Sequence, residues 1–118
     1  MLSKINRLKD KVNFTKVYRS GEKYFSPYFV MYVLDDKSPE QPVRIGIVTS
    51  KKVGGAVVRN RARRVLSEIL RQEIGSIKPG LTLVFVVLAA LAGTNHSTLQ
   101  KNTQEILTKA GIFTTSND

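Results

Sequence analysis

Five arginines and one asparagine lie close together in this sequence, and their chemistry suits phosphate binding. They are Arg59, Asn60, Arg61, Arg63, Arg64 and Arg71. The planar guanidinium group can donate two parallel hydrogen bonds to a phosphate, and it stays charged at any working pH. Glu68 is the only acid between Lys51 and Arg71. Like charges on one helix face repel each other, so the cluster indicates an anionic partner that offsets this cost.

A helix over residues 57–73 would turn these polar side chains away from its apolar side. Each helical residue advances about 100°, so with Val58 at zero the apolar set falls between roughly −20° and +80°. That set is Val58, Ala62, Val65, Leu66 and Ile69. The six polar residues spread over the opposite arc, and we expect them to face solvent together. A solvated basic face with no partner is the alternative interpretation.

The loop just before this helix adds to the same chemistry. It holds Lys51, Lys52, Gly54 and Gly55. The lysines bring mobile positive charge, and the glycines leave backbone amides accessible near the helix N-terminus, where an anion is favoured.

The charge of the whole chain agrees with an anionic partner. Lys and Arg number 19 and the acids 9, for a net charge of +10. The excess is uneven, because residues 1–23 hold seven bases and two acids, and residues 51–71 hold seven bases and one acid. Such a field favours RNA, DNA or an anionic membrane. A membrane is the least favoured of these, because the apolar stripe of the helix is too narrow to serve both a core and a bilayer.

Aromatic residues form a second candidate surface. Tyr24, Phe25, Tyr28, Phe29 and Tyr32 lie within nine residues. Strand alternation puts Tyr28 and Tyr32 on one face and Phe29 on the other. Exposed aromatics beside lysines are what single-stranded RNA stacks upon, whereas the alternative is that these rings belong to the core. We favour the core for Phe29 and leave the other rings open.

The elements that position these residues can be read from hydrophobic periodicity and turn residues. The pattern predicts helices over 11–19, 57–73 and 98–110, and strands over 28–34, 43–50 and 82–88. The last strand is almost uniformly apolar, so we expect it to be central and covered. The first ten or so residues read as a short basic arm. Together the 118 residues fit one α+β domain, with a single sheet and helices packed on it.

The string VGGAVVRNRARR resembles the signature of the bacterial ribonuclease P protein component. The resemblance extends to the early helix with Phe14 and Tyr18, to Arg44-Ile45-Gly46, and to Ser50-Lys51-Lys52. It implies a four-stranded sheet with three helices, in the order α-β-β-β-α-β-α. It also implies a left-handed crossover at the arginine helix, against the usual right-handed rule. The sequence departs from the family at Gly55, Ser67 and 88–91, where a basic residue is common.

The resemblance also implies a function. The RNA subunit would perform hydrolysis, and this chain, as its protein subunit, would assist endonucleolytic removal of the 5′ leader of precursor tRNA. The arginine-helix residues named above, Arg59 to Arg64 and Arg71, would bind that RNA. Phe14, Tyr18 and Tyr32 match the aromatics of a cleft for the single-stranded leader, with Lys51 and Lys52 nearby. The implied partners are ribonuclease P RNA and precursor tRNA, with Mg²⁺ in the holoenzyme and no cofactor bound by the protein alone.

Other functions fit the sequence less well. A ribosomal-type or general RNA-binding protein remains the main alternative, because composition alone suits it equally. A nuclease acting by itself would need a carboxylate or histidine cluster, but Asp35-Asp36 reads as turn chemistry and His96 as a solvated loop residue. There is no cysteine. The longest apolar run, Leu83 to Ala92, is far short of the roughly 20 residues that span a bilayer, and no secretory signal is evident. We therefore expect a soluble, cytoplasmic protein with no small-molecule substrate.

Overall fold

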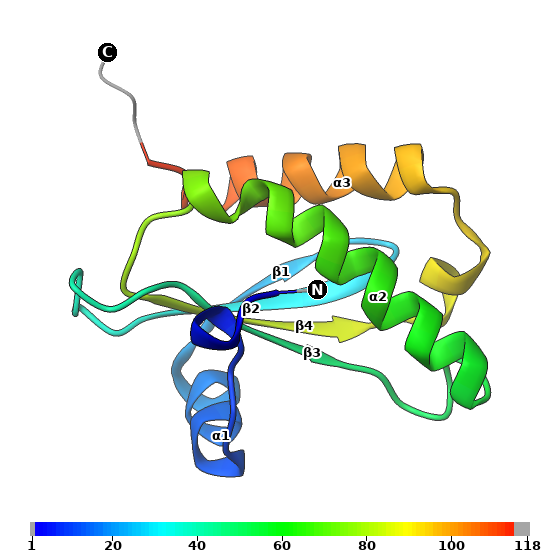
Figure 1. The fold of residues 1–118 in the computed structure, drawn as a ribbon, viewed down its shortest axis with the longest axis horizontal. Coiled ribbons are helices and arrows are strands. Elements are labelled where there is room, and N and C mark those ends of the chain that lie inside the picture. The colour runs from blue at the N-terminus through cyan, green and yellow to red at the C-terminus, as the bar shows by residue number, and fades with distance from the viewer. Residues whose placement is uncertain (1, 115–118) are drawn as a thin grey trace.

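The computed structural model describes residues 2–114 and is built around one mixed sheet (Figure 1). Its strands are β1 (Glu22–Phe25), β2 (Phe29–Asp35), β3 (Arg44–Val48) and β4 (Leu81–Val87), in the spatial order β1-β2-β4-β3. β2 runs antiparallel to both β1 and β4, whereas β3 and β4 are parallel. β4 is thus central, and six of its seven residues are buried, as its uniformly apolar sequence predicts.

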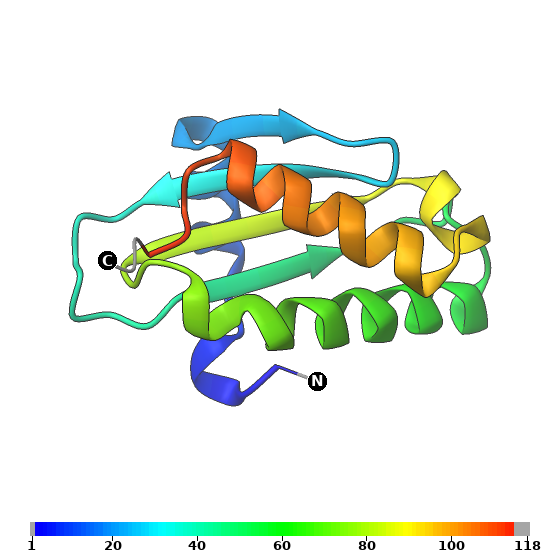
Figure 2. The same ribbon diagram turned by 90° about the horizontal axis from the view of Figure 1, so that it is seen from above.

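Helices cover both faces of the sheet. They are α1 (Lys11–Ser20), α2 (Ala56–Glu73) and α3 (His96–Lys109). Short 3₁₀ turns precede α1, follow α2 and precede α3, namely η1 (Lys4–Asn6), η2 (Ile74–Ser76) and η3 (Ala89–Gly93). α2 and α3 lie side by side on one face, and α1 crosses the other (Figures 1 and 2). The larger core lies under α2 and α3 around Phe29, Phe85 and Leu66, and the smaller one lies under α1 around Leu8, Val17 and Val84. Phe29 is fully buried, as expected.

The connection from β3 through α2 to β4 is left-handed. In Figure 2 the parallel strands β3 and β4 point to the right, and α2 lies on the near side of the sheet. When the view is turned so that both strands point upward, β4 lies to the left of β3, and this arrangement is a left-handed crossover. The predicted element order and this crossover are confirmed. The observed helix and strand ends differ from the expected ones by one or two residues, as is usual for boundaries inferred from pattern.

The buried face of α2 differs from the expected one. The expected stripe began at Val58, but Val58 is 39% exposed, and the buried residues are Ala62, Leu66, Ser67, Ile69 and Leu70. The reason is length, because an 18-residue helix extends about 27 Å and a five-residue strand only about 17 Å. The first turns of α2, which include Val58, therefore project beyond the sheet (Figure 1).

The N-terminal segment is more than a basic arm. Leu2 is buried in the larger core and Leu8 in the smaller one. Between them, Asn6 Nδ2 donates to the Val43 carbonyl at 2.8 Å, and the Leu8 amide donates to the Ile45 carbonyl at 2.9 Å. The segment thus covers the free edge of β3, and the outer strand β1, which the sequence pattern missed, forms the opposite edge of the sheet.

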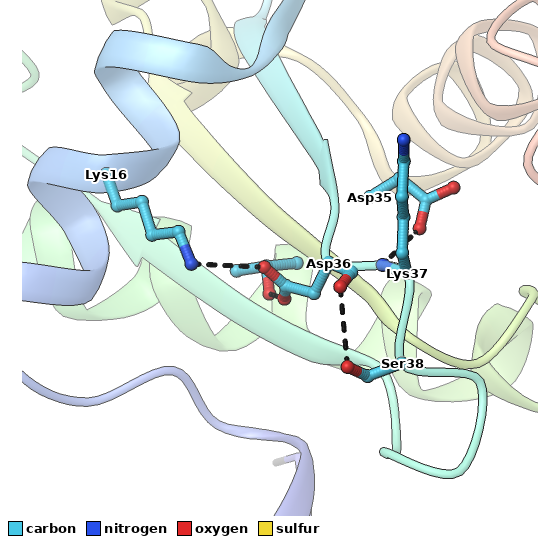
Figure 3. A network of polar contacts seen from close by, with 6 residues as sticks. Lys16, Asp35, Asp36, Lys37 and Ser38 are labelled. Carbon is cyan, nitrogen blue, oxygen red and sulfur yellow. Dashed lines mark hydrogen bonds and ion pairs between the residues drawn. The ribbon is translucent and has the colours of Figure 1, made fainter.

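Asp35 and Asp36 organise the turn after β2 (Figure 3), as expected from their turn chemistry. The Lys37 amide donates to Asp35 Oδ1 at 2.8 Å, and Lys37 adopts a positive φ of 56°. Asp36 accepts a bond from Thr82 Oγ1 at 2.7 Å and lies 3.7 Å from Lys16 Nζ of α1. The aspartates therefore have structural partners, and Asp36 ties α1 to the sheet.

Candidate nucleic-acid interface

The signature arginines lie along the outer side of α2. Asn60, Arg61, Arg63 and Arg64 are exposed, and these four residues are called the arginine surface below. Asn60 Oδ1 accepts a hydrogen bond from Arg63 Nη2 at 2.8 Å, which orients that guanidinium group. No acid of residues 2–114 forms an ion pair with these three arginines. Their charge is therefore available to an external anion.

The arginine surface is broader than one flat face. Arg61 borders a groove of about 440 Å³ between α2 and the start of α3, whereas Arg63 borders a smaller hollow at the β3 edge. The two side chains thus reach toward opposite flanks of the helix, with Arg64 exposed nearby. Our expectation that all the arginines face solvent together was wrong in this respect. A polyanion would have to wrap around the helix to meet them all.

Arg59 and Arg71 stand apart from this surface. Arg59 is half-buried, because the true buried face of α2 is rotated toward it, and its Nε is buried without a hydrogen-bond partner in the described part of the chain. Arg71 Nη2 donates to Glu68 Oε1 at 3.0 Å. That bond lowers the pKa of the Glu68 carboxyl to about 2, so Glu68 stays ionised far into the acid range. Glu68 partly offsets the charge of Arg71.

The loop before α2 holds its lysines at the surface. Lys51 and Lys52 are exposed, while Val53 is buried in the larger core and anchors the loop. Gly54 has φ of 150°, and a Cβ there would lie 2.8 Å from Val58, so this tight entry into the helix requires glycine. The first turn of α2 has no side-chain cap, so its amides are open.

Phe14, Tyr18 and Tyr32 come together between α1 and the sheet, and they are called the aromatic cluster below. The Tyr18 and Tyr32 rings meet edge to face with centroids 4.9 Å apart. Partial burial, and secondly the neighbouring Tyr32, raises the pKa of the Tyr18 phenol, which therefore stays neutral as a hydrogen-bond donor. Tyr28 instead packs against the larger core, contrary to the face that alternation predicted for it.

The Phe14 ring can lie against β3 because the residue beneath it, Gly46, has no side chain. A Cβ at Gly46 would lie 2.5 Å from two atoms of the Phe14 ring, so the ring rests directly on the backbone of β3. Phe14 and Arg63 also line the same hollow of about 180 Å³. The aromatic cluster and the arginine surface therefore adjoin at the β3 edge. Phe14 rests on the middle of β3, whereas Lys51 and Lys52 lie in the loop after the strand ends, and no described contact joins them to the aromatic cluster.

Lys23 borders the aromatic cluster, and it was not among the candidate site residues inferred from the sequence. Its Nζ lies 5.6 Å from the centroid of the Tyr32 ring, a cation–π distance. Lys23 and Tyr32 are directly paired residues of β1 and β2. The sequence pattern could not indicate this position, because it did not predict β1, the strand of only four residues that carries Lys23.

The described residues offer neither a metal site nor a membrane span. Within residues 2–114, no group of three or more His, Asp or Glu side chains could hold a metal ion. In the same range, no helix combines the length and the apolarity that are needed to cross a bilayer.

A mixed four-stranded sheet, a left-handed crossover and an arginine-rich helix at that crossover define a small basic protein of the RNA-binding class. The family model "Ribonuclease P" matches residues 2–111. The chain belongs to the ribonuclease P protein family, and its role accordingly lies in tRNA processing, as a component of a ribonuclease complex.

Two curated relatives illustrate the sequence similarity. The ribonuclease P protein component of Pseudanabaena sp. is 39% identical over 114 residues, which cover 96% of this chain and 97% of the relative. The ribonuclease P protein component of Clostridium novyi is 32% identical over 112 residues, covering 95% of this chain and 99% of the relative. These matches span nearly the full length of each protein.

Solved structures show the same fold. The Staphylococcus aureus RNase P protein superposes with a TM-score of 0.84 at 25% identity, covering 94% of this chain and 100% of that one. The Thermotoga maritima RNase P protein superposes with a TM-score of 0.77 at 25% identity, covering 87% and 96%. The four-stranded sheet and three helices implied by the resemblance are thus confirmed.

Proposed function

We propose that this chain binds the catalytic RNA of ribonuclease P through the arginine surface and holds the 5′ leader of precursor tRNA on the aromatic cluster. The observation that carries this proposal is the arginine surface itself, which presents three guanidinium groups with no acid of residues 2–114 paired to them. Guanidinium groups in such a setting bind phosphates strongly and with fixed geometry.

The adjacency of the two surfaces supports a bridging role. Arg63 and Phe14 border one hollow, so an RNA held by α2 would lie next to a strand held against α1. The net charge of +10 lowers the repulsion between two polyanions brought together in this way. The protein would then assist cleavage by positioning the leader beside the catalyst.

The chemistry of hydrolysis would belong to the RNA subunit. Phosphoryl transfer depends on metal ions and on positioning more than on covalent help from a protein. The described side chains do not fit a metal site, because no suitable cluster of ligands occurs among residues 2–114. We therefore assign the Mg²⁺ of the holoenzyme to the RNA and assign no catalytic residue to this chain.

Reconstitution tests the proposed function. The full chain is added to ribonuclease P RNA and precursor tRNA at low magnesium, where repulsion between the RNAs is least screened, and 5′ leader release is followed. We expect strong stimulation of cleavage over the RNA alone. Binding of both RNAs without any stimulation would favour a general RNA-binding protein. Cleavage by the protein alone that a chelator abolishes would instead favour a metal-dependent nuclease.

Glu68→Gln is expected to strengthen binding to the catalytic RNA by about two- to fivefold at low salt. The substitution removes the acid next to the arginine surface and releases Arg71 from its bond to Glu68. Because the pair is exposed, the gain should vanish as salt screens it. The measurement is a titration of labelled RNA over a salt series, and Glu105→Gln on α3 makes the same charge change elsewhere. Equal gains from both variants would show that only net charge matters.

A further inference from the structure

The outer strand β1 carries side chains on the same face of the sheet as the aromatic cluster. Tyr24 packs against the larger core on the α2 and α3 face. Because successive strand residues alternate, Lys23 and Phe25 lie on the opposite face, which α1 crosses. The register agrees, since Lys23 pairs with Tyr32 and Phe25 pairs with Val30.

Phe25 is unusually exposed for a residue of its kind. Its relative exposure is 70%, while Phe29 and Phe85, the two fully buried phenylalanines, are at 0%. β1 is an outer strand of the sheet, so the Phe25 ring can be approached from the strand edge as well as from the face. The Phe25 ring is exposed to water on a paired strand. A planar apolar group that stacks on this ring removes apolar surface from water, which is energetically favourable.

The neighbours of Phe25 identify the class of that planar group. Lys23, two residues earlier on the same face, contacts the Tyr32 ring, which in turn contacts Tyr18. A positive charge therefore lies over the Tyr32 ring of the tyrosine pair, on a residue two positions before Phe25 in β1. Alternation of aromatic faces with cations suits a single-stranded nucleic acid, whose bases stack on rings while its phosphates meet the cations.

We propose that Phe25 and Lys23 form an additional base-stacking subsite at the β1 edge of the aromatic cluster. Its occupant is an unpaired nucleobase of the single-stranded RNA whose neighbouring bases contact Tyr18 and Tyr32, and Lys23 meets the phosphate between them. The subsite rests on the proposed function, because it extends the leader path assigned there. It adds one base to that path, so it selects for leaders long enough to reach β1.

An introduced tryptophan tests the subsite directly. The chain contains no tryptophan, so Phe25→Trp places a single indole on β1. Stacking of a base on that indole should quench its fluorescence when a short single-stranded RNA is titrated. Val12→Trp is the matched control, because Val12 is 76% exposed and lies on the opposite side of α1 from the buried Val17. Anisotropy of labelled RNA measures binding independently in both variants.

Affinity supplies the second measurement. Phe25→Ala should weaken binding of a long leader at least about fivefold, whereas Phe25→Tyr should bind like the native chain and Val12→Ala should have no effect. A leader too short to reach β1 should not respond to Phe25→Ala. RNA binding without quenching at position 25, together with native affinity of Phe25→Ala, overturns the subsite alone. Failure of the native chain to bind single-stranded RNA contradicts both the subsite and the leader-binding part of the proposed function.

Discussion

Replacing Arg61, Arg63 and Arg64 together by glutamine is expected to weaken binding to ribonuclease P RNA by at least about 10³-fold at low salt. Each exposed guanidinium group can make charge-assisted bonds to phosphate, and none has an ion-pair partner among residues 2–114 that would compete for it. Every phosphate that is no longer neutralised reduces the log–log salt slope by about 0.7–0.9, so the slope should flatten by about 2 to 3.

The control removes the same charge from another part of the surface. Lys78, Lys101 and Lys109 are exposed and lie outside α1 and α2, with Lys101 and Lys109 on α3 and Lys78 just before β4. Their joint replacement by glutamine should change the affinity far less and leave the salt slope almost unchanged. Equal losses of affinity in the two triple variants would mean that the RNA responds to net charge and not to the arginine surface.

Gly46→Ala should destabilise the protein by about 1–3 kcal/mol and lower its Tm by on the order of 10 °C. The new Cβ would meet the Phe14 ring at 2.5 Å and Leu8 at 3.3 Å. β3 cannot move to relieve this contact, because Gly46 is paired with Val84 of the central strand. The Phe14 ring must therefore shift, and α1 with it, so the Tyr18–Tyr32 contact should loosen and leader binding should weaken.

Thermal unfolding by circular dichroism measures this effect. Gly93→Ala is the matched control, since a Cβ there meets nothing within 4 Å, and it should change stability by less than about 0.5 kcal/mol. In the double variant Gly46→Ala with Phe14→Ala the clash is gone. The stability lost in this double variant should therefore be well below the sum of the losses in the two single variants. If the stability losses of the two substitutions were strictly additive, the result would contradict the contact between the Phe14 ring and Gly46.

Periodicity and composition predicted the elements that are long and uniform. The uniformly apolar residues 82–88 indicated a buried central strand because neither face of β4 meets water. The apolar repeat of residues 57–73 marked α2 within a residue of its observed start. The charge imbalance around Arg59 to Arg64 indicated the arginine surface because few acids nearby in the sequence balance it.

Features set by long-range packing could not be predicted in this way. β1 is too short to show an alternating pattern, and its pairing with β2 depends on a partner strand beyond a turn. Leu2 and Leu8 sit among basic residues, and nothing local shows that they bury on either side of β3. The exposed start of α2 follows from how far the helix overhangs the sheet, and the half-buried Arg59 follows from the rotation of its buried face. Both are properties of the assembled fold.

Crosslinking from α2 tests most directly whether the arginine surface meets the catalytic RNA. The chain has no cysteine, so a single one can carry a photoreactive group. Val57→Cys places it on the first turn of α2, where Val57 is 83% exposed, and Thr108→Cys places it at the exposed end of α3. We expect efficient crosslinks to ribonuclease P RNA from position 57 and almost none from position 108. Crosslinks from position 108 with none from position 57 would contradict the account.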